Sequence, residues 1–186
     1  MAALIYSSIT SLDGYINDRD GNFDWAEPDA EVHAFINDLQ RPVRTFLFGR
    51  RTYDVMTAWE TLDPGNSPEM ADFAAEWHAT DKIVYSRTLD RVTTARTELR
   101  RKFDPAEVLR LTAGADHDLL IGGPGIAAEA LRAGVVDEIQ QFICPVVVGG
   151  GTPFLPDDLR MPLRLLEERQ FAASGVVYLR YSTSHH

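Results

Sequence analysis

The chain has 186 residues, of which 45% are hydrophobic and 25% charged, as expected for a globular domain with a full hydrophobic core. Its formal net charge of −10 argues against a general affinity for nucleic acid or for an anionic membrane surface. The single cysteine, Cys144, excludes a disulfide framework, and there is neither a long apolar stretch nor a basic-then-apolar leader. We therefore expect one cytoplasmic domain over residues 1–186, with residues 183–186 as a disordered or tag-derived tail.

Strands and helices are predicted to alternate along most of the chain. Clusters of apolar and β-branched residues predict strands at Ala3–Ile9, Thr45–Phe48, Lys82–Tyr85 and Leu119–Ile121, with a weaker strand near Val92–Thr94. Helical spacing and capping residues predict helices at Asp29–Gln40, Tyr53–Ala58, from the Asp63–Pro68 loop to about His78, Pro105–Ala113 and Ile126–Ala133. A long strand, Glu138–Val148, is followed by a hairpin of Leu163–Phe171 and Val176–Tyr181. This order predicts an α/β three-layer fold, with a mainly parallel central sheet, antiparallel C-terminal strands and flanking helices.

The stretch DLLIGGPGIAAEALRAG is typical of a short strand, a glycine turn and a helix. Gly122, Gly123, Pro124 and Gly125 leave the turn almost without side chains, and Ile126 follows in the helix. Free backbone N–H groups at a helix start suit a phosphate, because glycine lets the backbone approach an anion closely. The turn is also compatible with a plain strand-to-helix connection. A Rossmann fold would need an acidic residue about 20 positions later, and none occurs there, so another fold would have to hold a dinucleotide.

Two other predicted strands end in turns that carry cationic and hydroxyl side chains. These residues are Gly49, Arg50, Arg51 and Thr52 after one strand, and Ser86 and Arg87 after the next. Ligands of an open α/β sheet bind at the carboxyl ends of its strands, so these turns and the glycine turn can converge. Each arginine alone is also compatible with a solvated surface residue. Two phosphate sites, one for a pyrophosphate and one for a further phosphate, describe NADP better than NAD.

Six motifs occur in order over nearly the whole chain: SITSLDGYI, TFLFGRRTY, KIVYSRTL, DLLIGGPGIAAEAL, VDEIQQFICPVVVGGGTPFL and SGVVYLRY. As an ordered set they resemble the dihydrofolate-reductase-like superfamily. Within it, the chain resembles the C-terminal reductase domain of the bifunctional riboflavin-biosynthesis deaminase/reductase and its stand-alone relatives. The resemblance implies an NADPH-dependent reductase, often paired as a homodimer. The deaminase half is absent, because no H-x-E with a following P-C-x-x-C occurs.

The same resemblance implies roles for the three turns. Gly49–Thr52 match the family's G-R-x-T and would hold the cofactor's phosphates, and Ser86–Arg87 match its S-R beside the adenosine 2′-phosphate. Gly122–Gly123 match its glycine pair against the pyrophosphate, and Pro124–Ile126 begin the helix. Gly149–Gly151 resemble its G-x-G, for which flexible closure and a simple strand break are both open.

Reduction of a C=N or C=O by hydride transfer also requires a proton, so we expect an acid near the nicotinamide. The resemblance implies that the Ser11–Gly14 loop lies there, which makes Asp13 one candidate. Asp29, at the start of the first predicted helix, is the other. Asp13 could instead form a turn, and Asp29 could instead cap the helix. No His, Cys or acidic cluster has metal-ligand spacing, so we expect no metal.

The sequence thus predicts an NADPH-dependent reductase of a small heterocyclic substrate. The substrate would be an aminopyrimidine of riboflavin biosynthesis, resembling 5-amino-6-(5-phosphoribosylamino)uracil, or a pterin. The first helix offers no clear pterin-binding acid, which disfavours folate. A catalytically silent NADP(H)-binding protein or sensor is the alternative, and a reductase of unrelated carbonyl compounds is a third hypothesis. No nucleic-acid or membrane partner is expected.

Overall fold

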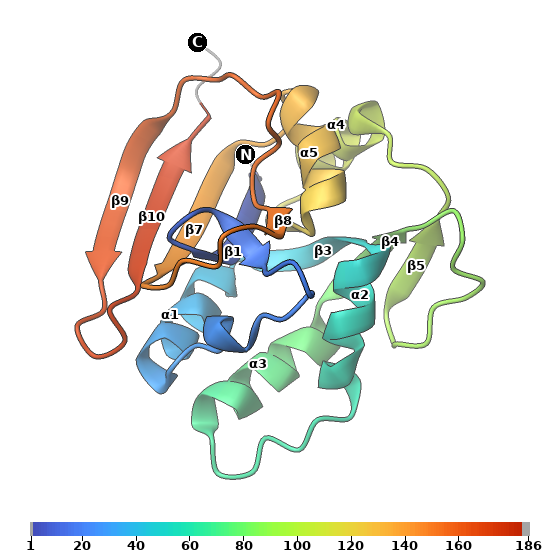
Figure 1. Ribbon diagram of the computed structural model, residues 1–186. Coiled ribbons are helices and arrows are strands. Elements are labelled where there is room, and N and C mark those ends of the chain that lie inside the picture. The colour runs from blue at the N-terminus through green and yellow to red at the C-terminus, as the bar shows by residue number, and fades with distance from the viewer. Residues whose placement is uncertain (1, 184–186) are drawn as a thin grey trace.

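The computed structural model describes residues 2–183 and is built around one eight-stranded sheet (Figure 1). Its strand order is β5-β4-β3-β6-β1-β7-β10-β9. The strands are β1 (Leu4–Ser11), β3 (Val43–Gly49), β4 (Asp81–Tyr85), β5 (Thr97–Arg100), β6 (Asp118–Gly122), β7 (Glu138–Cys144), β9 (Arg164–Gln170) and β10 (Val177–Ser182). From β5 to β7 all neighbours are parallel, whereas β10 runs antiparallel to both β7 and β9. A small antiparallel pair, β2 (Tyr15–Asn17) and β8 (Thr152–Pro153), lies outside this sheet.

Helices cover both faces of the sheet, which completes the three layers expected from the sequence (Figure 1). They are α1 (Ala30–Gln40), α2 (Arg50–Met56), α3 (Pro68–Ala79), α4 (Pro105–Gly114) and α5 (Pro124–Arg132), with short 3-10 turns η1 (Asp24–Ala26) and η2 (Thr57–Glu60). The alternation along β3 shows how one strand serves both faces: Phe46 and Phe48 pack with α2 and α3, whereas Leu47 packs with α4 and α5. The fold class predicted from the sequence is confirmed.

The weak strand expected near Val92–Thr94 is wrong, because the fifth strand lies at Thr97–Arg100. The backbone N–H groups of Thr93 and Thr94 donate instead to the buried hydroxyl of Tyr53, at 2.9 and 3.2 Å. These residues therefore bind a helix side chain rather than a neighbouring strand. The tertiary contact overrides the β propensity of the segment.

Two other boundaries differ from the expectation. The strand predicted to run to Val148 ends at Cys144, since Pro145 has no N–H group for the sheet. The helix expected from Tyr53 begins three residues earlier, so Arg50 belongs to its first turn.

At the C-terminus, the Thr183 N–H donates to the carbonyl of Asp137 at 3.1 Å, while residues 184–186 of the expected tail lie outside the described residues.

Gly149, Gly150 and Gly151 lie in a loop beyond β7 that packs tightly against the segment after β2. All three have positive φ, and a Cβ on Gly151 would lie 1.9 Å from the carbonyl oxygen of Asn17. Gly151 is therefore required by a close approach of two backbones, whereas a Cβ on Gly150 would meet the Arg19 side chain and one on Gly149 would meet nothing. Neither of the two interpretations left open for this tripeptide had included that contact.

Two fully buried tyrosines allow a test of the tether between β1 and the segment after β8. The Tyr6 hydroxyl donates to the carbonyl of Phe154 at 2.8 Å, whereas the hydroxyl of Tyr178 has no partner within the described structure. We expect Tyr6→Phe to lower the free energy of unfolding by about 1–2 kcal/mol, because it leaves a buried carbonyl unsatisfied. Tyr178→Phe, the matched control, should be neutral or stabilising. Urea denaturation measures both, and equal losses would contradict the assigned role of the hydrogen bond.

Candidate cofactor site

The three turns singled out in the sequence lie side by side at one edge of the sheet. They follow β4, β3 and β6, which are adjacent and parallel. The register pairs Gly49 with Tyr85 and Phe48 with Gly122, so the three strands end at the same level. The geometry therefore brings Gly49–Thr52, Ser86–Arg87 and the glycine turn together, as expected for a ligand site of an open α/β sheet.

The first of these turns supplies two arginines with different surroundings. Arg50 donates to the Thr88 hydroxyl at 2.9 Å and lies 3.5 Å from the Asp54 carboxylate. Arg51 is exposed and has neither a hydrogen bond nor an ion pair with any residue between 2 and 183. Arg50 is thus committed to protein contacts, whereas Arg51 is available for an anionic ligand.

The glycine turn is shaped by close packing against the first turn. Gly123 has φ +100°, and a Cβ there would lie 2.5 Å from the Thr52 hydroxyl oxygen. A Cβ on Gly122 would lie 2.8 Å from the ring of Phe48. Packing alone therefore requires both glycines, as in the plain strand-to-helix interpretation. Gly125, in the first turn of α5, is exposed and would place a Cβ in open space.

The turn after β4 begins with a nearly buried serine. The Ser86 hydroxyl accepts hydrogen bonds from the backbone N–H groups of Thr88 and Leu89, at 3.3 and 3.0 Å. These bonds close a compact turn and leave the exposed Arg87 side chain projecting from it. Like Arg51, Arg87 has no ion pair or hydrogen bond in the part of the chain that the structure describes.

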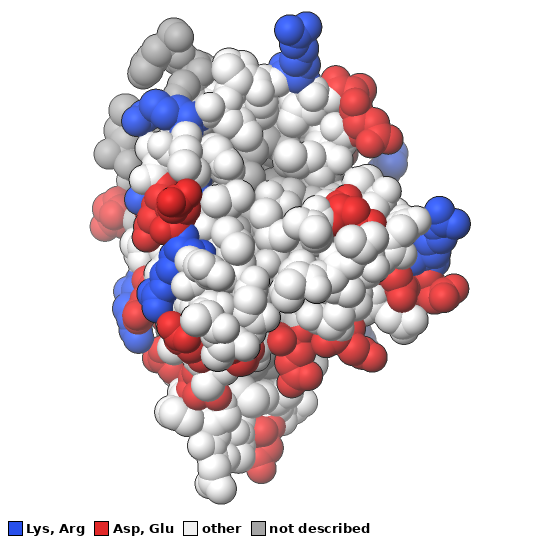
Figure 2. All heavy atoms as spheres, turned by 60° about the vertical axis from the view of Figure 1, so that its left-hand side comes forward, with Lys and Arg blue, Asp and Glu red and all other residues white. Residues whose placement is uncertain are grey.

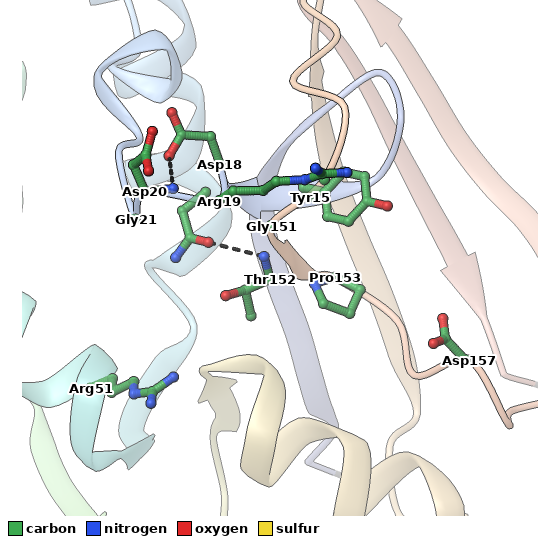
Figure 3. Close-up of a pocket in the computed structure, with 12 residues that line it drawn as sticks. Tyr15, Asp18, Arg19, Asp20, Gly21, Arg51, Gly151, Thr152, Pro153 and Asp157 are labelled. Carbon is green, nitrogen blue, oxygen red and sulfur yellow. Dashed lines mark hydrogen bonds between the residues drawn. The ribbon is translucent and has the colours of Figure 1, made fainter.

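A cavity of about 830 Å³ opens beside Arg51 (Figure 3). The sequence analysis missed most of its lining, which comes from β2, β8 and the loops that join them to the sheet. The lining residues are Tyr15, Asn17, Asp18, Arg19, Asp20, Gly21, Arg51, Gly150, Gly151, Thr152, Pro153 and Asp157. The three consecutive glycines before Thr152 were the one sequence signal for this wall, since they permit its close packing against the segment after β2.

Asp13 does not point freely into this cavity. Its two carboxylate oxygens accept hydrogen bonds from the N–H groups of Val148 and Gly149, at 3.1 and 2.8 Å. A hydrogen bond from the Ser11 side chain lowers the pKa of the Asp13 carboxyl, and these backbone N–H groups lower it further. The carboxylate therefore joins two loops, and its role as a proton donor stays a prediction.

Asp29 is the N-cap of α1, and its carboxylate accepts a hydrogen bond from the Val32 N–H at 2.9 Å. It also lines a second cavity of about 290 Å³ together with Trp25 and Phe142, and no residue lines both cavities. His33, one turn along α1, packs against Trp59 and Phe73, and burial lowers the pKa of its imidazole. The structure thus does not bring Asp13 and Asp29 together in one cavity.

Among residues 2–183 no group of His, Cys, Asp and Glu side chains could hold a metal ion. Cys144 is buried, and desolvation raises the pKa of its thiol, which disfavours the thiolate. No helix in the described chain is long and apolar enough to cross a membrane.

Comparison with known proteins places this fold and these motifs in one family, because residues 2–178 match the RibD C-terminal domain. The chain belongs to the RibD C-terminal domain family. The chain is 29% identical over 184 residues to the uncharacterized protein YyaP of Bacillus subtilis. The alignment covers 96% of this chain and 93% of YyaP.

Solved structures extend the similarity of this RibD C-terminal domain at the level of the fold. A pyrimidine reductase-like protein from Corynebacterium diphtheriae superposes with a TM-score of 0.71 at 14% identity, covering 100% of this chain and 93% of the other. Dihydrofolate reductase from Enterococcus faecalis, complexed with NADP(H), gives a TM-score of 0.64 at 15% identity, with coverages of 97% and 95%. At these identities the match establishes the dihydrofolate-reductase-like fold.

The packing of the glycine turn predicts opposite outcomes for two substitutions. Gly123→Ala should destabilise the protein by about 1–2 kcal/mol, because the new Cβ meets Thr52 and the positive φ is unfavourable for alanine. Gly125→Ala should be neutral or slightly stabilising, since it lies in a helix with open space around it. Thermal denaturation compares them, and equal melting temperatures would show that Thr52 and Gly123 do not constrain each other.

Proposed function

We propose that this protein is an NADPH-dependent reductase of a small heterocyclic substrate. The proposal rests on one observation above all. Two exposed arginines without anionic partners, Arg51 and Arg87, lie beside the glycine turn, in the turns that end the next two strands of the same parallel sheet. On a chain with a net charge of −10, unpaired cations at this edge favour a multiply charged anion.

The donor set fits the phosphates of NADPH. Arg51 and the first turn of α5, which begins after Gly123 without a side-chain cap, would hold the pyrophosphate. Gly125 leaves that helix start open to an approaching anion. Arg87, projecting from the next turn, would bind the 2′-phosphate that distinguishes NADPH from NADH. When bound, the cofactor supplies the hydride, and the protein orients it against the substrate.

Family membership supports an aminopyrimidine as the substrate, and a pterin as the other heterocycle. The structurally similar protein from Corynebacterium diphtheriae is named as pyrimidine reductase-like, and the one from Enterococcus faecalis is named as a dihydrofolate reductase. The cavity beside Arg51 is large enough for a heterocycle and carries amide and hydroxyl groups from Asn17, Tyr15 and Thr152. Arg19, on the same wall, adds a cation that suits a phosphorylated substrate.

A catalytically silent NADP(H)-binding protein or sensor remains a second candidate because of one specific observation. Both acids proposed to handle the proton already make structural hydrogen bonds: Asp13 holds the loop at Val148 and Gly149, and Asp29 caps α1. A protein that retained only cofactor binding would show the same arrangement. Turnover distinguishes the two functions.

The proposal includes a homodimer. The face of β7 and β10 that turns away from α1 carries Ile143, Val177, Leu179 and Tyr181, all only partly buried. Figure 2 shows a broad uncharged surface with charged side chains gathered around it, on the side of the molecule where β9 and β10 lie. An uncharged patch on this otherwise acidic chain supports association of two copies.

Titration with NADPH and NADH, followed by tryptophan fluorescence, tests the proposed cofactor. Wild-type protein should prefer NADPH, and Arg87→Ala should weaken NADPH by roughly 10- to 100-fold, the loss of a charge-assisted contact worth about 1.5–3 kcal/mol. NADH affinity should change little, because NADH lacks the 2′-phosphate. Arg51→Ala should weaken binding of both cofactors, since both carry the pyrophosphate.

Arg164→Ala provides the matched control. It removes the same charge from β9, at the opposite end of the strand order from β4. An equal loss in this control would indicate a general electrostatic effect. If the wild-type protein bound neither nucleotide, both the reductase and the silent-binder functions would be excluded.

Single-turnover hydride transfer tests the two candidate acids. Asp13→Asn and Asp29→Asn remove the acid, and the second variant can still cap α1 because asparagine is a good N-cap. If one of them is the proton donor, its substitution should slow the step by about 100-fold. If neither variant slows it, another proton source operates. If NADPH binds but no pyrimidine, pterin or carbonyl compound oxidises it, the silent-binder function is supported.

A further inference from the structure

The turn that carries Arg87, residues 86–90, is held by side chains from two different elements. From α2, Arg50 donates to the Thr88 hydroxyl at 2.9 Å. From the end of β5, Arg101 contacts the turn on its backbone. Neither contact is evident from the sequence. Arg50 and Thr88 are 38 positions apart, and Arg101 is 15 positions from Ser86.

Arg101 gathers the carbonyl groups of this turn around a single guanidinium. One of its terminal nitrogens donates to the carbonyls of Ser86, at 3.3 Å, and Leu89, and the other donates to the carbonyl of Asp90 at 3.5 Å. The carbonyl of the preceding residue, Arg100, accepts a backbone hydrogen bond from the Ser86 N–H at 2.9 Å. This backbone contact at the end of β5 places Arg101 next to the turn.

The chemistry of this contact is specific to arginine. A guanidinium offers five N–H donors in one plane, so it can bind several carbonyls at once, whereas an ammonium is a compact point charge. Arg101 also differs from its neighbour Arg100, which pairs with Glu98 and Glu107. Arg101 has no ion pair with any carboxylate in the described part of the chain. Its polar contacts are thus with the backbone of the turn alone.

These contacts constrain the position of Arg87. The Ser86 hydroxyl binds two N–H groups of the turn, and Arg101 binds three of its carbonyls. Arg87 lies between the bonded carbonyl of Ser86 and the bonded N–H of Thr88, so its backbone is held from both sides. The positive charge of Arg101 also offsets three carbonyl dipoles that would otherwise lie uncompensated near a bound anion.

We propose that Arg101 is a positioning residue for cofactor selectivity: by fixing the 86–90 turn it holds Arg87 in place for the 2′-phosphate, without itself contacting that phosphate. This inference rests on the proposed NADPH-dependent function. It extends that function from the residues that bind the cofactor to one whose effect on selectivity depends on Arg87.

A double-mutant cycle on the full-length protein separates positioning from direct binding. Arg101→Ala should weaken NADPH by about tenfold while NADH affinity stays unchanged. In the Arg87→Ala background the same substitution should have no further effect on NADPH, because the residue it positions is gone. Arg101→Lys should recover only part of the loss, since lysine cannot match the planar set of donors.

Lys102→Ala is the matched control. Lys102 is exposed, adjacent in sequence and equally charged, but it makes no hydrogen bond or ion pair with the turn. It should leave the selectivity for NADPH unchanged. Hydrogen exchange without nucleotide gives an independent readout: Arg101→Ala should accelerate exchange of the amides of Thr88 and Leu89, and Lys102→Ala should not.

The outcomes identify which proposal fails. If wild-type protein shows no preference for NADPH, the proposed function is wrong, whatever Arg101 does. If the preference exists but Arg101→Ala leaves it intact, or lowers both cofactor affinities equally, the positioning role alone is overturned. Additive losses in the cycle, or an equal loss in Lys102→Ala, would instead indicate a direct or general electrostatic effect and would also overturn it.

Discussion

The candidate site depends on the close approach of two turns, the start of α2 and the start of α5. The Thr52 hydroxyl occupies the space into which a Cβ of Gly123 would project, and the ring of Phe48 does the same for Gly122. This packing is possible because β3 lies between β4 and β6 and ends level with both. Bare backbone at Gly122 and Gly123 is therefore first a packing requirement. The bare backbone that results is available to the anionic ligand proposed for this edge.

The different roles of the arginines follow from the same geometry. Arg50 and Arg101 bind protein groups around the 86–90 turn, whereas Arg51 and Arg87 have no partners among the described residues. Four arginines near one edge thus comprise two that organise the site and two that are available to a ligand. Sequence alone could not separate these roles. Arg50 and Arg51 are both exposed arginines, and they differ only in whether a neighbouring side chain binds them.

The regular fold and the three turns were predictable from the sequence, because apolar strands such as Leu4–Ser11 and Asp118–Gly122 are largely buried. The end of such a strand then fixes where its turn lies. Prediction failed where distant groups decided the local structure. The hydroxyl of Tyr53 binds the backbone of Thr93 and Thr94, so that segment does not join the sheet. The cavity wall was missed because β2 and β8 pair across more than a hundred residues, and the hydrogen-bond partners of Asp13 are equally distant in sequence.

The loops around β2 and β8 have a consequence for how the chain can vary. Asp13 accepts hydrogen bonds from the N–H groups of Val148 and Gly149. Asn17 accepts one from the Thr152 N–H, and Arg19 donates one to the Gly149 carbonyl, so the two loops interlock. Each loop therefore supplies hydrogen-bond partners to the other. An insertion in one must be matched by a change in the second, and a loop taken alone from a relative would not fit. The wall of the cavity would therefore be inherited as a unit, and a change of substrate would require both segments to change together.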